Sequence, residues 1–164
     1  TRNYSRSYRR RLPAETLLDA VNDITGVDDE FNGCPPGTRA MQTWSYKVRS
    51  HFLDAFGRPN SSSDCPCERD MRTSVVQSLH MMNSKVLQTK LSSGEGRVKV
   101  LADSKQSPEE VVVELYLMAL GRMPTQDELS KAVAAFTKKD VKRQEAAEDV
   151  LWALLNSPEF VFNH

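Results

Sequence analysis

Apolar residues recur at helical spacing through most of the chain. The pattern predicts a first helix over residues 13–25, because a proline suits the first helical turn and Gly26 suits a helix end. The apolar face of this helix consists of Leu17, Leu18, Val21 and Ile24. A second helix is predicted over residues 45–56, with Val48, Phe52 and Phe56 on one face.

A third, longer helix is predicted over residues 70–91. Its apolar stripe is made of Met71, Val75, Leu79, Met82 and Val86. Asn83 falls close to the middle of that stripe, and His80 falls at its edge. Because a buried amide must find hydrogen-bond partners, we expect Asn83 to fasten a loop to this helix. A short further helix is expected over residues 97–104.

Three more helices follow, and two of them begin with a capping box. Ser107 with Glu110, and Thr125 with Glu128, have the spacing at which a hydroxyl and a carboxylate accept from the backbone of a first helical turn. The fourth helix is predicted to end at Gly121, and the sixth to cover residues 141–156. The inward faces of the three helices are Val112, Leu115, Tyr116 and Ala119; Leu129, Val133 and Phe136; and Ala147, Val150, Leu151 and Leu154. A last turn is expected at residues 157–160.

Prolines, glycines and serines concentrate in residues 27–43 and 58–69, which are predicted to be loops. Sustained strand alternation is missing from the sequence. We therefore predict an all-α fold in one domain over residues 1–164. It is expected to be a compact bundle of about six helices, with a basic arm at residues 1–12 and a long ordered, cysteine-containing loop at residues 58–69 before the third helix.

Composition and charge narrow the class of protein. Of 164 residues, 39% are hydrophobic and 27% charged, which is typical of a globular domain. Lys plus Arg and Asp plus Glu both number 22, so no net field favours nucleic acid as a partner. The longest uncharged apolar runs are too short for membrane insertion. The chain starts at Thr1 without a signal-peptide pattern, and we expect a piece excised from a larger multidomain protein.

The most specific chemical feature is the run Cys65-Pro66-Cys67-Glu68-Arg69, which with Arg58 forms the candidate functional loop. Two cysteines at this spacing can bind one metal ion, with Cys34 as a third ligand and His51 or His80 as a fourth. A disulfide from Cys34 to one of the pair, or three plain thiols, are the alternatives. Covalent haem is excluded because the C-x-x-C-H motif is missing, and no other cofactor is expected.

Other motifs of catalysis are missing from the sequence, including nucleotide-binding loops and the G-x-S-x-G and H-E-x-x-H patterns. The carboxylates at residues 28–30 have no evident partner base, and those at residues 109–110 suit a helix N-terminus. Catalysis by this chain alone is therefore not expected.

Several blocks of sequence, in this order, carry a resemblance to a known family. They are residues 10–15, 18–20, 36–40, 52–59, 65–69, 77–83, 114–117, 151–160 and 163–164. Together they resemble the C-terminal domain of the large planctomycete-type proteins known as domain of unknown function 1553. The resemblance implies an upstream domain in the same polypeptide, often with a cytochrome c domain and carbohydrate-binding-like modules, and an extracytoplasmic location. It also marks Cys65, Cys67, Glu68, Arg69, His80 and Asn83 as recurrent positions; Pro66 stands where the family commonly has Glu.

Three functions follow as hypotheses. The first is a non-catalytic structural or interaction domain that packs on its upstream neighbour. The second is an accessory redox or metal-binding domain centred on Cys65 and Cys67. The third, a part of a polysaccharide-acting hydrolase, requires two carboxylates that face each other across a cleft.

Overall fold

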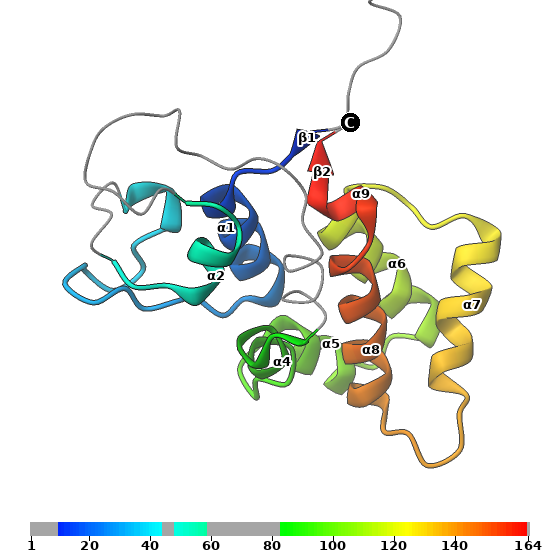
Figure 1. Cartoon of the computed structure of the whole chain (residues 1–164). Coiled ribbons are helices and arrows are strands. Elements are labelled where there is room, and N and C mark those ends of the chain that lie inside the picture. The colour runs from blue at the N-terminus through cyan, green and yellow to red at the C-terminus, as the bar shows by residue number, and fades with distance from the viewer. Residues whose placement is uncertain (1–9, 44–47, 59–82, 164) are drawn as a thin grey trace, which may run out of the picture.

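Helices account for almost all regular structure in the computed structural model, which describes residues 10–43, 48–58 and 83–163 (Figure 1). The prediction of an all-α fold is therefore confirmed. The described helices form two groups, one from the N-terminal part of the chain and one from the C-terminal part. Both groups contribute to one apolar core.

The N-terminal group is built around α1 (Ala14–Thr25), which packs against the 3-10 turn η1 (Ala40–Gln42) and against α2 (His51–Ala55). The predicted end of α1 is confirmed, because Gly26 adopts a left-handed conformation with φ of 70°. The β-carbon of an alanine there would lie 3.0 Å from Cγ of Arg97. Gly26 therefore allows both the turn and the close approach of α5.

The C-terminal group is arranged around α8 (Arg143–Leu155). The other elements are α4 (Lys85–Leu91), α5 (Arg97–Asp103), α6 (Pro108–Leu120), α7 (Gln126–Phe136), α9 (Pro158–Val161) and β2 (Phe162–Asn163). Helix α8 packs against α4, α5, α6, α7 and α9. Both capping boxes are confirmed: Ser107 accepts from the backbone of Glu110, and Thr125 from that of Glu128.

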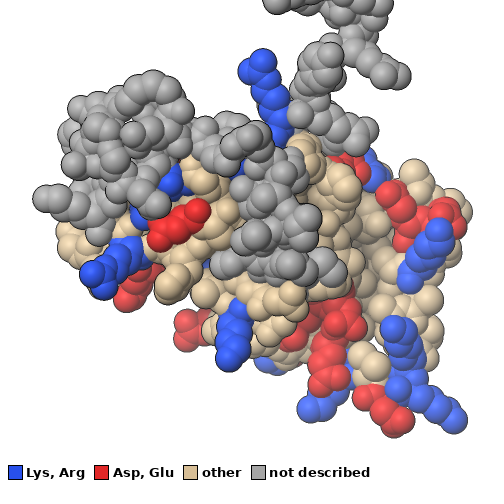
Figure 2. Space-filling model, in the orientation of Figure 1, with Lys and Arg blue, Asp and Glu red and all other residues tan. Residues whose placement is uncertain are grey.

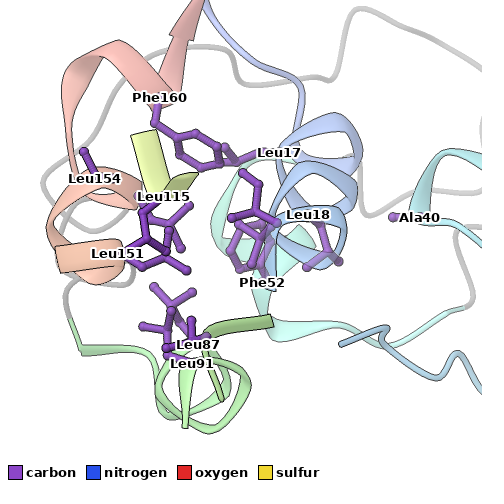
Figure 3. Packing of buried hydrophobic residues seen from close by; sticks show 14 of the residues in the cluster. Leu17, Leu18, Ala40, Phe52, Leu87, Leu91, Leu115, Leu151, Leu154 and Phe160 are labelled. Atoms are coloured by element: carbon purple, nitrogen blue, oxygen red, sulfur yellow. The ribbon is translucent and has the colours of Figure 1, made fainter. Parts of the chain in front are cut away.

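The core lies where the two groups meet (Figure 3). Leu17 and Phe52 of the N-terminal group point toward Leu115 and Leu151 of the C-terminal group. Leu17, Leu115 and Leu151 are all completely buried. The two groups therefore fold as one unit, because each supplies one side of the same apolar interior.

The two ends of the described chain also meet. Strand β1 (Arg10–Arg11) pairs antiparallel with β2, so that Arg11 lies opposite Phe162. The Leu12 backbone N–H donates to the carbonyl of Val161 at 3.0 Å. The buried Arg11 guanidinium donates to the carbonyl of Phe56 at 2.8 Å and lies over the Phe56 ring. This one side chain therefore fastens the pairing to the end of α2.

Two predictions about helices were wrong. The second helix begins at His51, where Ser50 accepts from the backbone of Leu53, and not at residue 45. Ser84 similarly caps a new helix, α4, inside the predicted third helix. The new start changes which residues face inward: Leu87 and Leu91 are buried, whereas Val86 is 47% exposed and Asn83 is also exposed.

Buried charges connect segments that are far apart in the sequence. The carboxylate of Asp19 on α1 accepts the backbone N–H groups of Ala40 and Met41 at 2.7 and 3.1 Å. Lys90 on α4 donates to the carbonyl of Val27 at 2.7 Å and pairs with Asp29 at 3.2 Å. Asp29 thus has a basic partner that the sequence analysis did not find.

None of the helices in the described part of the chain has both the length and the hydropathy that a membrane span requires.

Candidate functional site

The residues of the predicted functional loop fall mostly outside the described ranges. This applies to Cys65, Cys67, Glu68, Arg69 and His80. A choice among disulfide, thiol and metal chemistry at the two cysteines stays a prediction. Within residues 10–43, 48–58 and 83–163, no three His, Cys, Asp or Glu side chains are grouped so that they could hold a metal ion.

The candidate residues that the structure does describe have different surroundings. Cys34 is half-buried against the core and is a free cysteine, while His51 is exposed at the start of α2. Arg58 is buried, and its guanidinium donates to the carbonyl of Val48 and to the Asp54 carboxylate at 2.9 Å. Arg58 therefore holds the segment before α2 against the end of that helix.

A hollow of about 320 Å³ lies between α6, α7 and α8. Its floor is apolar and includes Val150, Leu154 and the small residues Ala132, Ala135 and Ala153. Tyr116 of α6 also lines the hollow. Charged side chains surround this floor: Glu128, Lys131 and Lys138 from α7 and the α7–α8 link, and Asp149 from α8. An open apolar hollow with charged walls can accept the side chains of a ligand or of another protein.

An ion cluster around Arg122 lies next to this hollow. The Arg122 guanidinium makes paired hydrogen bonds to the Glu128 carboxylate, at 2.8 and 2.9 Å, and to the Glu159 carboxylate, at 2.6 and 2.7 Å. The guanidinium carbon lies 5.6 Å from the centre of the Tyr116 ring. Arg122 thereby joins the α6–α7 link to the first turn of α7 and to α9. Paired hydrogen bonds of this kind restrict the geometry as well as adding stability.

The cluster determines the protonation of the acids and phenol beside the hollow. Hydrogen bonds from Arg122, and then from the backbone of Thr125, lower the pKa of Glu128 from 4.5 to about 2. Burial, and then the charge of Glu128, raises the pKa of Tyr116 above 10.0. At neutral pH Glu128 is therefore ionised and Tyr116 is protonated. A carboxylate with so low a pKa is a poor proton donor and a weak base.

The lowered pKa of Glu128 predicts a specific acid dependence. In the unfolded chain this carboxylate takes up a proton near pH 4.5, but in the folded chain only near pH 2. Its contribution to stability is therefore complete above pH 4.5 and is lost as the pH falls toward 2. Glu128→Gln is expected to lower the thermal midpoint at neutral pH, and the difference from wild type should shrink over this window. Thermal unfolding at several pH values measures both.

Asp127→Asn is the matched control, because it removes the neighbouring carboxylate of the same helical turn. The ion pair of Asp127 with Lys131 leaves both side chains 74% exposed, so its removal should alter the acid dependence much less. A constant difference between wild type and Glu128→Gln from neutral pH to pH 2 would contradict the assignment.

A second hollow, of about 390 Å³, lies on the other side of α8, toward α4. Glu148, Asp149 and Trp152 of α8 line it, and Asp149 lines both hollows. Figure 2 shows acidic side chains gathered over α8 and basic ones to its right, over α7 and the α7–α8 link. The sequence analysis missed these residues as a site. Alanines between charged residues at 131–138 were the one available signal, and they equally suit an ordinary exposed helix.

The comparisons with known proteins add a family but no function. The model of a family described as "PSD1: Protein of unknown function (DUF1553)" matches residues 1–136. No curated protein and no solved structure matches the chain. The matched part extends from the N-terminus to the end of α7, so it includes α6 and α7 of the hollow but not α8.

Proposed function

Since the chain belongs to the PSD1 family of proteins of unknown function (DUF1553), we propose its function from its side-chain chemistry: a non-catalytic structural and interaction domain. In this proposal it packs on an upstream domain of the same polypeptide, and its surface, not a reactive centre, performs the function. An extracytoplasmic location belongs to the same proposal and rests on the planctomycete-type resemblance.

One observation carries the proposal. Several strongly bonded charged side chains of the described chain hold one backbone segment to another and do not face a reaction space. Asp19 holds η1, Arg11 holds the end of α2, and Lys90 holds the segment after α1. Arg143 of α8 likewise donates to the carbonyls of Ala102 and Gln106. A catalytic group must instead reach the substrate and exchange protons near the working pH.

The main hollow also argues against the hydrolase hypothesis. Glu128 and Asp149 both line it, and a pair of carboxylates is what glycoside hydrolysis uses. One member of such a pair needs a raised pKa in order to donate a proton. The pKa of Glu128 is lowered, and both of its oxygens accept hydrogen bonds from Arg122. Glu128 is therefore suited to a structural role.

Deletion within the parent polypeptide tests the proposal. We expect removal of residues 1–164 to lower the thermal midpoint of the remaining domains, because a surface that this domain covers becomes exposed to solvent. Addition of the purified chain in trans should restore part of that loss. Unchanged stability and unchanged activity of the remainder would refute the packing role. Turnover of substrate by the purified chain alone would refute the non-catalytic part.

A further inference from the structure

The surface formed by α7 and α8 has an incomplete cover. Within α7 no residue is fully buried, and its apolar side chains, such as Leu129, Val133 and Phe136, are only half-buried although they pack against the core. Ala153 of α8 is exposed at the edge of the hollow. Small side chains at these positions allow another backbone to approach closely.

The charges on this surface are separated by sign. Lys131 and Lys138 are seven residues apart, so they lie on the same side of α7 and its C-terminal extension. Glu148 and Asp149 lie on α8, between the two hollows. The surface therefore has a basic edge along α7 and an acidic edge along α8, with the apolar floor between them (Figure 2).

A surface with this arrangement is complementary to itself. Rotation by half a turn about an axis parallel to α7 and α8 brings the basic edge of one copy over the acidic edge of the other. The same rotation brings the two apolar floors together, as in a symmetric dimer interface. We propose that the α7–α8 surface docks a second copy of this chain, with Lys131 and Lys138 of each copy facing Glu148 and Asp149 of the other.

The size of the surface sets the expected strength. Helix α7 has 11 residues and α8 has 13, so they are about 16 and 20 Å long. Side by side they offer a footprint of about 400 Å². This is at the small end for specific association, where complexes are weak and transient. The charge pairs lie at the edges and in solvent, so salt should weaken the dimer.

Charge reversal on the whole chain tests the proposal. Wild type is expected to form dimers at high micromolar concentration and low salt, and to dissociate when the salt is raised. The double variant Lys131→Glu/Lys138→Glu should associate about tenfold more weakly, and so should Glu148→Lys/Asp149→Lys. An equimolar mixture of the two variants should form heterodimers, because each copy then presents the sign that the other needs. Sedimentation velocity measures all four cases.

The double variant Arg10→Glu/Lys105→Glu is the matched control. It changes the net charge by the same amount as the α7 variant, but at exposed residues in β1 and after α5. It should leave the dimer unchanged, and thermal unfolding of every variant confirms that it is folded. A wild type that stays monomeric would overturn the proposal and leave the surface to a different protein. Homodimers that persist in both reversal variants, or a failure of the mixture to associate, would also overturn it. Neither result depends on the upstream domain, so the proposed function is tested separately.

Discussion

Replacing Leu151 with alanine is expected to lower the free energy of unfolding by about 3 kcal/mol. Leu151 is completely buried in α8, the helix that packs against α4, α5, α6, α7 and α9, and it faces Leu115 across the core (Figure 3). Truncation leaves a cavity that neither helix group can close without separating from the other. Folded proteins of this size are stable by about 5–15 kcal/mol, so the loss is a large part of the total. Equilibrium unfolding in urea measures it.

Val100→Ala is the control for this prediction. It also shortens an apolar side chain in the C-terminal group, but Val100 on α5 is 65% exposed. Its removal should change the free energy of unfolding by no more than about 0.5 kcal/mol. Equal effects of the two substitutions would show that the interface between the two helix groups contributes little to stability.

Elements with strong local signals could be predicted from the sequence. The starts of α6 and α7 are determined by Ser107 and Thr125 with the glutamates three residues later, and the end of α6 by Gly121. These interactions form within one turn, so they act in the same way whatever the rest of the chain does. The inward face of α8 was also predicted correctly, because Ala147, Val150, Leu151 and Leu154 have unambiguous helical spacing.

The start of α4 could not be placed, because serine has two readings within a helical pattern. Ser84 can continue a helix at a small cost, or it can cap a new one. The apolar pattern alone favoured continuation and placed Val86 inward. In the structure Ser84 accepts from the backbone of Leu87, and the phase of the new helix buries Leu87 and Leu91 instead. One capping hydrogen bond thus decides which apolar residues enter the core.

The polar connections between segments were beyond the reach of the sequence. Arg11 and Phe56 are 45 residues apart, and Lys90 and Val27 are 63 apart. Each pair involves a side chain and a backbone carbonyl, and every residue has such a carbonyl. The candidate site shows the same difficulty, because the hollow combines residues of three helices whose packing determines it.

The Asp19 carboxylate should be the most important polar group of the N-terminal part. Its side chain is only 6% exposed, and it accepts the backbone N–H groups of Ala40 and Met41. Asp19→Ala leaves both donors without this partner, and hydrogen bonds to a charged group contribute about 1.5–3 kcal/mol each. We expect a loss of about 3 kcal/mol in the free energy of unfolding, and a smaller loss for Asp19→Asn, which keeps one acceptor oxygen. Urea unfolding gives these values.

Asp23→Ala separates this role from a general effect of charge. Asp23 lies one turn further along α1 and pairs with Arg39 at 2.6 Å, but its side chain is 57% exposed. Screening by solvent makes such a pair weak, so its removal should have only a small fraction of the effect of Asp19→Ala. Hydrogen exchange adds a local readout: the amides of Ala40 and Met41 should lose protection in Asp19→Ala and keep it in Asp23→Ala. Equal protection in the two variants would mean that the packing of Ala40, and not the Asp19 carboxylate, holds η1 against α1.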